Sequence, residues 1–549
     1  MTLPSDQYGA LAFSMRGISK SFGSVCANEQ IDFMVRQGEI HALLGENGSG
    51  KSTLMNVLSG VYRPDCGSLE VFGKQRFFHS PGDAIRCGIG MVYQHFKLAE
   101  SLTATDNIMA GLSRTQIADA IRSVRQAPDS EGHEDKTAAP IRSSGYRKNW
   151  KSDLVRRFAS RFHVEFDPDK PASQLSVSEK QSVEIIKVLI RGAKILVLDE
   201  PTAVLTPQET KRLFGVLRNM RDRGCSVVFI SHKLGEIMEL CDRVTVLRKG
   251  RSVDTLVVSE VDTYDLVERM VGHKVELEIA RPDPNPEHEE CLRVDSLSYL
   301  DEKGVRKLSG VSFSTFYGEI LGVAGLAGGG QKELCEVIAG IIRPDGGAIA
   351  VDGESITGLS PRSISAKGVS MCFIPEDRLG MGLVASMGMV ENVLLKEYAF
   401  QKGIFIHSDA ARSKSEQIVE ELDILTPSVS HPVRLLSGGN IQKVILGREI
   451  HLKPKLMIAA YAVRGLDIQS SYTIYRLLNE QKARNVSVLY IGEDLDVLMA
   501  LCDRILVLCQ GENMGIVDAR NTTKIELGQM MSGTKLEVLR SGVDYVSNR

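Results

Sequence analysis

The sequence predicts an α/β protein built from two tandem copies of one domain. Short apolar runs alternate with helical stretches in each half, which is the pattern of a mostly parallel sheet covered by helices. Peptides of the first half also return in the second: 63–67 (RPDCG) as 343–347 (RPDGG), and 240–244 (LCDRV) as 501–505 (LCDRI). A chain of 549 residues has room for both domains.

The repeat locates one insertion and the boundary between the copies. The spacing between matching peptides falls by about 19 residues along the chain, so the first copy holds extra residues. The polar stretch 126–149 is their expected place and is typical of a disordered surface insertion. A polar run with three prolines begins at Arg281, so we expect an extended linker over 279–290. The domains are therefore predicted at 8–278 and 291–536.

The strongest motif is a phosphate-binding loop in the first copy. An apolar strand at 40–44 leads into a glycine-rich loop, and a helix follows it. The glycines allow backbone N–H groups to point at phosphate oxygens, and the helix N-terminus adds partial positive charge. Lys51 is expected to reach the β- and γ-phosphates and Ser52 to hold Mg²⁺. The residues assigned to this loop are Gly45, Glu46, Asn47, Gly48, Ser49, Gly50, Lys51, Ser52 and Thr53.

A second strand of the first copy ends in two carboxylates. The apolar run 195–198 continues into Asp199 and Glu200, and ligands bind at the C-terminal ends of strands in such sheets. Asp199 is predicted to bind Mg²⁺ directly or through water, and Glu200 to act as the base that orients water for attack on the γ-phosphate. A solvated strand end is the alternative interpretation.

Three single residues of the first copy are weaker candidates. Gln94 follows an apolar strand and could reach Mg²⁺ or the attacking water. His232 follows the apolar strand 227–230 and could hydrogen-bond the γ-phosphate, although a lone histidine is usually structural. Phe22 precedes the loop and could stack on adenine, with a core position as the alternative.

The second copy lacks the chemical groups of the first. Gln331 takes the place of the loop lysine, and Lys332 takes the place of the adjacent hydroxyl. Ala460 and Tyr461 take the places of the two carboxylates, and Glu493 stands where the first copy has its histidine. Neither a metal ligand nor a catalytic base is predicted there.

These motifs, in this order, resemble the nucleotide-binding domain of ATP-binding cassette (ABC) transporters. The family carries a signature L-S-G-G-Q before the strand with the carboxylates. The first copy reads LSVSE at 175–179 and has lost both glycines, whereas the second copy keeps Ser437, Gly438 and Gly439. The resemblance implies an α/β fold of two tandem P-loop NTPase domains, each with a parallel core sheet, a small antiparallel β subdomain and a helical subdomain.

The resemblance also implies a division of labour between the copies. ABC domains resemble head-to-tail pairs in which each nucleotide lies between the loop of one domain and the signature of the other. Lys51 would then face Ser437, Gly438 and Gly439, while Gln331 would face the altered signature at Ser176. We expect one composite site that hydrolyses ATP with Mg²⁺ and one degenerate site, for which nucleotide binding stays open.

Fused twin cassettes resemble the ATPases of bacterial importers for simple sugars and nucleosides. The segment 201–209 (PTAVLTPQE) is similar to the nucleoside branch, which also handles solutes such as riboflavin. The resemblance implies partner permease subunits in the membrane, an extracytoplasmic solute-binding protein and a peripheral position on the cytoplasmic face of the bacterial inner membrane. The candidate permease contacts are His95, Phe96 and Lys97, which follow Gln94, and residues 379–383 of the second copy, with surface-loop residues as the alternative.

Net charge, apolar run length and cysteine pattern exclude several classes of protein. The net charge is −3 with no long basic run, so nucleic acid is not an expected partner. No apolar run approaches 18 residues, no signal peptide is recognised, and the 10 scattered cysteines are typical of reduced thiols. A soluble twin-cassette ATPase acting on ribosomes is one alternative, which the short, proline-rich linker disfavours. A non-hydrolysing regulator is another, which the intact motifs of the first copy disfavour.

Overall fold

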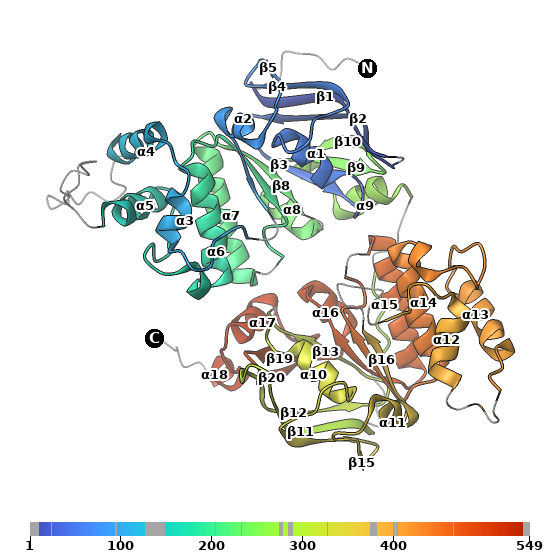
Figure 1. The fold of residues 1–549 in the computed structure, drawn as a ribbon. Helices are drawn as coiled ribbons and strands as arrows, with labels where there is room; N and C mark the ends of the chain where they lie inside the picture. Colours follow the sequence, from blue (N-terminus) through green and yellow to red (C-terminus); the bar gives the residue numbers. More distant parts are fainter. Residues whose placement is uncertain are drawn as a thin grey trace. The chain divides into compact units, whose positions relative to one another are not determined.

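The computed structural model shows two compact units, formed by residues 1–275 and 276–549 (Figure 1). Each unit contains one large sheet, one small sheet and a group of helices at one end. The structure describes residues 10–23, 25–93, 96–126, 149–203, 205–231, 233–273, 278–283, 289–326, 328–373, 382–398, 401, 405–464 and 466–541.

The large sheet of the first unit has six strands in the order β10-β9-β3-β8-β7-β6. All neighbours pair in parallel except β9 and β10, which form an antiparallel hairpin at one edge. Every residue of β3 is buried, as its unbroken apolar run predicts. The strands are β3 (Ile40–Gly45), β6 (Ile89–Val92), β7 (Ile195–Asp199), β8 (Ser226–Ile230), β9 (Arg243–Arg248) and β10 (Arg251–Val257).

The small sheet of the first unit is antiparallel and covers helix α1 (Lys51–Leu58). Phe13 of this sheet, Leu54 of α1 and Leu43 of β3 belong to one buried apolar cluster. The helix that follows the glycine-rich loop is therefore packed between the two sheets. The strands, in the order β2-β1-β4-β5, are β1 (Leu11–Phe22), β2 (Val25–Arg36), β4 (Cys66–Val71) and β5 (Lys74–Arg76).

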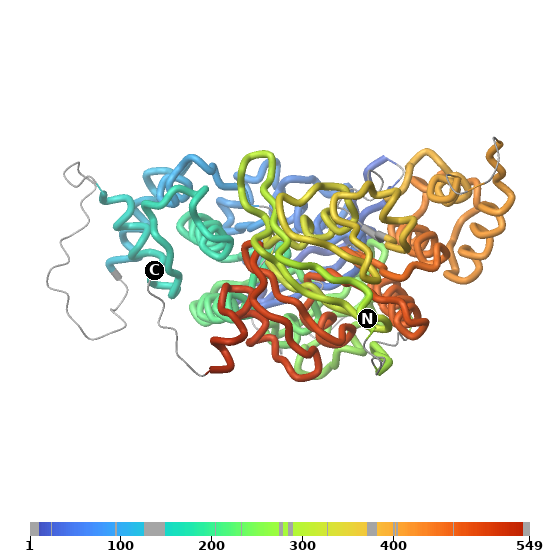
Figure 2. The backbone as a smooth tube through the Cα atoms, turned by 90° about the horizontal axis from the view of Figure 1, so that it is seen from below, coloured from blue at the N-terminus to red at the C-terminus, as the bar shows by residue number. Residues whose placement is uncertain are grey.

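Helices complete the first unit. A helical group of α3, α4, α5 and α6 lies at one end of the unit in both views (Figures 1 and 2). Its members pack on one another, and α6 also packs on β6 of the core sheet. The helices are α2 (Pro81–Arg86), α3 (Ala104–Met109), α4 (Arg114–Gln126), α5 (Trp150–Ser160), α6 (Val177–Leu189), α7 (Pro207–Asp222), α8 (Leu234–Leu240) and α9 (Thr263–Val271).

The second unit repeats both sheets. Its large sheet runs β16-β17-β18-β13-β19-β20 and its small sheet runs β12-β11-β14-β15. The strands are β11 (Glu290–Leu300), β12 (Arg306–Phe316), β13 (Ile320–Ala324), β14 (Gly346–Val351), β15 (Glu354–Ser355), β16 (Val369–Phe373), β17 (Leu456–Ala460), β18 (Ser487–Ile491), β19 (Arg504–Cys509) and β20 (Glu512–Asp518).

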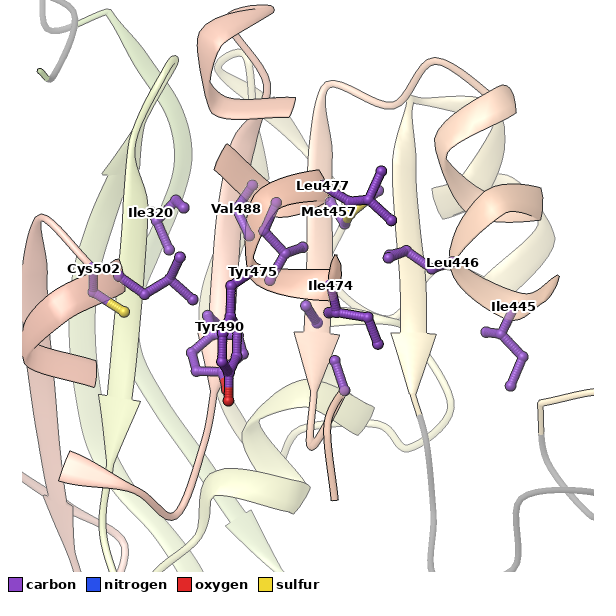
Figure 3. Close-up of a cluster of buried hydrophobic side chains, with 14 of the residues drawn as sticks. Ile320, Ile445, Leu446, Met457, Ile474, Tyr475, Leu477, Val488, Tyr490 and Cys502 are labelled. Carbon is purple, nitrogen blue, oxygen red and sulfur yellow. The ribbon is translucent and has the colours of Figure 1, made fainter. Parts of the chain in front are cut away.

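Helix α15 packs on the large sheet of the second unit. Leu477 of the helix lies over Met457 and Val488 of the strands, and Tyr475 lies beside Tyr490 (Figure 3). The helices are α10 (Gln331–Ile338), α11 (Pro361–Ala366), α12 (Met389–Glu397), α13 (Asp409–Glu421), α14 (Gly438–His451), α15 (Ile468–Ala483), α16 (Leu495–Leu501), α17 (Lys524–Met531) and α18 (Leu536–Ser541).

The fold confirms the predicted architecture of two α/β domains with parallel core sheets. Within the parts that the structure describes, no helix is long and apolar enough to span a membrane. Residues 280–283 of the predicted linker belong to the second unit and bond within it, through Asn479 Nδ2 to the Ala280 carbonyl (3.0 Å) and Arg520 to Asp283 (2.7 Å). The predicted insertion lies almost entirely outside the described residues, as do the candidates Gln94, His95 and His232.

Candidate active site

The glycine-rich loop joins the end of β3 to the start of α1. Gly48 and Gly50 adopt φ angles of 80° and 98°, which side chains disfavour. A Cβ on Gly50 would also lie 2.5 Å from the Ala27 carbonyl oxygen. No side chain caps α1 at Gly50. The N–H groups of its first turn are therefore suited to an anionic ligand.

Lys51 folds back over this loop. Its Nζ donates hydrogen bonds to the carbonyl oxygens of Gly45 (2.6 Å) and Glu46 (2.9 Å). Burial lowers the pKa of Lys51, and the nearby carboxylates of Glu200 and Asp199 oppose this shift. The structure thus brings the loop lysine and both predicted carboxylates into one electrostatic cluster. A buried ammonium held mainly by carbonyl oxygens is suited to pair with phosphate.

The two carboxylates lie at the end of β7. Burial and the adjacent Glu200 carboxylate raise the pKa of Asp199, whereas Lys51 lowers it. Glu200 has a φ angle of 47°, rare for a residue with a side chain, and its N–H bonds to the Ile230 carbonyl (3.0 Å). Ser52 lies exposed at the start of α1. A carboxylate and a hydroxyl are oxygen ligands of the kind that Mg²⁺ prefers.

A hydrogen-bonded brace joins the ends of β7 and β8 to helix α8. Oε2 of Glu236 accepts hydrogen bonds from the hydroxyls of Thr202 (2.7 Å) and Ser231 (2.9 Å). Lys233 Nζ lies 3.4 Å from Oε1 of the same carboxylate. Sequence reasoning missed Glu236. The only signal was an acidic residue in the first turn of a helix that follows a candidate strand end.

The corresponding loop of the second unit keeps its backbone but not its charge. Gly330 has a φ angle of 106° and precedes α10, as Gly50 precedes α1. Buried Gln331 donates from Nε2 to the Leu326 carbonyl (3.2 Å), so a neutral amide occupies the position of the ammonium. The Lys332 side chain is 55% exposed and lies 3.7 Å from Glu336 of the same helix.

In the second unit, Tyr461 occupies the position that corresponds to Glu200 of the first unit. Tyr461 repeats the turn of Glu200, with a φ angle of 54° and its N–H bonded to the Ile491 carbonyl (2.9 Å). Burial raises the pKa of Tyr461 to about 12, so its phenol stays neutral. Arg464 lies 6.0 Å from this ring and 3.8 Å from Glu493. Ala460 at the preceding position is fully buried and has no ligand atom in its side chain.

The second unit has also lost the brace. Its residues at the three braced positions are Val463, Gly492 and Val497, and both valines pack against the apolar core. The polar network is thus present only in the unit that keeps the lysine and the carboxylates. The brace is therefore not required by the fold that the two units share.

The two signature helices differ at their N-termini. Helix α14 begins at Gly438, capped by Ser437, whose Oγ accepts a hydrogen bond from the Asn440 amide Nδ2 (3.0 Å). Its first turn has no acidic residue. A Cβ on Gly439 would lie 2.8 Å from Ser470 Oγ of α15. The turn is compact and retains the positive end of its helix dipole for a ligand.

Helix α6 instead neutralises its own N-terminus. Ser176 caps the helix, and the carboxylate of Glu179 accepts a hydrogen bond from the Ser176 N–H (2.7 Å). Lys170 pairs with the same carboxylate at 3.3 Å. Val177 in the first turn is exposed. The altered signature therefore presents Val177 and Ser178 where the other presents two glycines, and the carboxylate of Glu179 where the other has Asn440.

Phe22 ends β1 and is 44% exposed, so the alternative of a core position was wrong. Its predicted contact with adenine stays a prediction. The predicted residues Lys51, Asp199 and Glu200 come together in the first unit, and Ser437, Gly438 and Gly439 form one helix N-terminus in the second.

Comparisons with known proteins agree with this arrangement. The ABC transporter family model matches residues 28–203 and 308–459. Guanosine import ATP-binding protein NupO of Bacillus subtilis is 39% identical over 95% of this chain and 97% of NupO. Glucose import ATP-binding protein TsgD13 of Haloferax volcanii is 38% identical over 94% of this chain and 95% of its own length.

A third relative, nucleoside import ATP-binding protein NupA of Lactococcus lactis, is 37% identical over 94% of this chain and 97% of its own length. The family matches fall one in each unit and include both glycine-rich loops, and the first match also includes Asp199 and Glu200. The chain belongs to the ABC transporter family and carries two of its ATP-binding cassettes.

Proposed function

We propose that this protein is the ATP-hydrolysing subunit that powers import of a small hydrophilic solute, a nucleoside or a simple sugar, through partner permease subunits. The observation that carries the proposal is the cluster of Lys51, Asp199 and Glu200 in the first unit. The names of the similar proteins, which concern guanosine, glucose and nucleosides, support the direction of transport and the solute class.

The first cassette supplies the groups for phosphoryl transfer to water. The glycine-rich loop binds the phosphates through backbone N–H groups, and Lys51 exchanges its carbonyl partners for phosphate oxygens. Ser52 and Asp199 would hold Mg²⁺, which neutralises charge on the phosphates. Glu200 orients the attacking water and accepts its proton. Gln94 and His232 are proposed to contact the water or metal and the γ-phosphate, respectively.

One hydrolytic site per chain is part of the proposal. We propose that the N-terminus of α14, at Ser437, Gly438 and Gly439, completes the site of the first cassette. This N-terminus is closely packed, and no acidic side chain in its first turn offsets the positive end of the helix dipole. The loop of the second cassette would not hydrolyse ATP, since Gln331 and Tyr461 replace its lysine and its base. We propose the cassettes at 8–278 and 291–536, joined by a linker at 279–290.

An importer requires a path for its solute across the membrane, and the proposed partners of this chain supply that path. We propose that integral membrane permease subunits supply that path and that an extracytoplasmic solute-binding protein delivers the solute. The ATPase would then sit peripherally on the cytoplasmic face of the cell membrane. Phe96 and Lys97 are candidate permease contacts, and exposed Lys97 is the better placed.

The Glu200→Gln variant tests the proposed base. We expect ATP turnover to fall by about 10²–10⁴-fold, because general-base catalysis contributes about that much, while ATP binding is kept. Glu239→Gln, on the exposed surface of the same unit, is the matched control and should keep normal turnover. Normal turnover in Glu200→Gln would reject the base assignment. Cofractionation with ribosomes instead of membranes would favour the ribosomal alternative.

A further inference from the structure

Two exposed aromatic rings contact one another in the first cassette. Phe22 at the end of β1 is 44% exposed, and Tyr62, four residues beyond the end of α1, is 36% exposed. Their ring centroids are 5.1 Å apart at an interplanar angle of 71°, an edge-to-face contact. Such pairs are favourable beyond the area that they bury. The contact therefore restrains the orientation of the Phe22 ring.

Asp65 fixes the backbone on which this ring pair is built. Its carboxylate accepts hydrogen bonds from Ser21 N–H (2.7 Å) and Lys20 Nζ (2.8 Å), and its own N–H bonds to the Ser19 carbonyl (2.8 Å). Lys20 Nζ also lies 5.6 Å from the centroid of the Phe22 ring. The end of β1 is thus held to the segment that follows α1, which also carries Tyr62.

The second cassette keeps the anchor and loses both rings. Asp345 accepts a hydrogen bond from Leu300 N–H (2.6 Å) and bonds to the Ser298 carbonyl (2.9 Å), as Asp65 does with its partners. The residue that follows Leu300 is Asp301, and Ile342 stands at the position of Tyr62. The anchor therefore serves the fold, whereas the rings accompany the loop that keeps its lysine.

We propose that Tyr62 is a positioning residue that holds the Phe22 ring for stacking on the nucleotide base, and that it thereby sets the base selectivity of the first cassette. The proposal rests on the proposed function, because it assumes that ATP binds the loop at Lys51. With Tyr62 in edge-to-face contact and Lys20 Nζ over the ring at 5.6 Å from its centroid, the orientation of Phe22 is restrained, and we propose that the exposed part of the ring meets the flat base. A purine offers more stacking area than a pyrimidine, so the pair favours ATP over CTP.

The test compares nucleotides with a ligand that has phosphates but no base. In the full chain, Tyr62→Ile installs the residue of the second cassette. We expect the affinity for MgATP to fall by about two- to tenfold, the range for loss of one aromatic pair. Affinity for inorganic tripolyphosphate should not change, nor should turnover at saturating ATP. The preference for ATP over CTP should fall by a similar factor, and Tyr62→Phe should restore wild-type values.

Matched variants keep the outcomes separate. Tyr264→Ile removes another exposed tyrosine of the same unit and should leave both affinities unchanged. Equal losses of ATP and tripolyphosphate affinity in Tyr62→Ile would mean a general disturbance of the loop and would overturn the proposal, as would no loss of either. Since Glu200→Gln tests the proposed function independently, loss of turnover there with no effect of Tyr62→Ile would reject the base-positioning role alone.

Discussion

At the scale of single residues, the site combines a buried ammonium with two half-buried carboxylates. Asp199 and Glu200 are consecutive carboxylates, and Lys51 is the cation that lies among them. Burial and the adjacent carboxylate disfavour the charged form of Asp199, so the pKa of that group is raised in the folded protein. The charged form of Asp199 therefore lowers the stability of the folded protein.

The raised pKa of Asp199 predicts a trade between stability and activity. Above the raised pKa the folded state holds an unfavourable charge, so this residue lowers the free energy of unfolding as pH rises from about 3.9, the ordinary value. We expect Asp199→Asn to raise Tm at pH 7.5 and to abolish most turnover. The gain should shrink as pH falls toward 4. Thermal unfolding at several pH values measures it, with Asp222→Asn, at an exposed site, as control. An unchanged or lower Tm at pH 7.5 would contradict the expectation.

At the scale of elements, the two signature helices differ in what their first turns present. Helix α6 has a capping carboxylate from Glu179, and α14 has none. Capping by a carboxylate stabilises a helix but cancels the partial charge that attracts an anion. Each helix is therefore suited to only one of two tasks, local stability or ligand binding.

Exchanging residues between the signature turns tests this division. Gly439→Ser installs the residue of the first cassette at a site where a Cβ would lie 2.8 Å from Ser470 Oγ. We expect turnover to fall at least about tenfold, about 1.4 kcal/mol of lost transition-state stabilisation. The reciprocal Ser178→Gly should leave turnover within about twofold of wild type, since its helix is not proposed to contact a hydrolysed nucleotide. The reverse ranking would contradict the proposed pairing.

The brace on α8 is the second element-scale feature. Glu236 ties Thr202 and Ser231, at the ends of neighbouring strands, to one helix. We expect Glu236→Val, the residue type of the second cassette, to lower kcat about tenfold or more with little change in ATP affinity, because it frees the catalytic turns. Steady-state kinetics measures the two parameters. Glu239→Val on the exposed side of α8 is the control. An effect confined to ATP affinity would assign the brace to binding.

At the scale of the whole molecule, the two cassettes share one fold and differ in chemistry. The second unit keeps the glycine-rich turn at Gly330 and the strained turn at Tyr461. The backbones of the two units therefore have the same conformation at these two turns. Its lysine, carboxylates and brace are replaced by neutral or apolar groups. Among the motifs named above, the first unit departs from the family only in its signature sequence, LSVSE at 175–179.

Because only the first cassette keeps the lysine and the carboxylates, we expect the two glycine-rich loops to contribute unequally to ATP turnover. Lys51→Ala should lower ATP turnover by at least about a hundredfold, since it removes the buried cation that pairs with phosphate. Gln331→Ala should leave turnover within about threefold of wild type, because a neutral amide supplies no such charge. Turnover of both variants in the full chain measures the difference. Comparable losses in the two variants would show that both cassettes hydrolyse ATP.

The sequence alone determined the two-domain α/β architecture, both glycine-rich loops and the carboxylate pair. These features are local: a buried strand requires a continuous apolar run, and the loop requires glycines where φ is positive. The replacement of Lys51 by Gln331 could likewise be read from the repeat. Each depends on a short stretch of sequence, either read by itself or compared with its repeat.

Only the tertiary structure decided what supports the site. Glu236 bonds to Thr202 across 34 positions, and Phe22 contacts Tyr62 across 40. Neither pair shares a periodic pattern or a turn signal, so no local rule connects them. Such partners are fixed by the packing of strands and helices that are distant in sequence, because the sheet brings together strand ends whose order in space differs from their order in the chain.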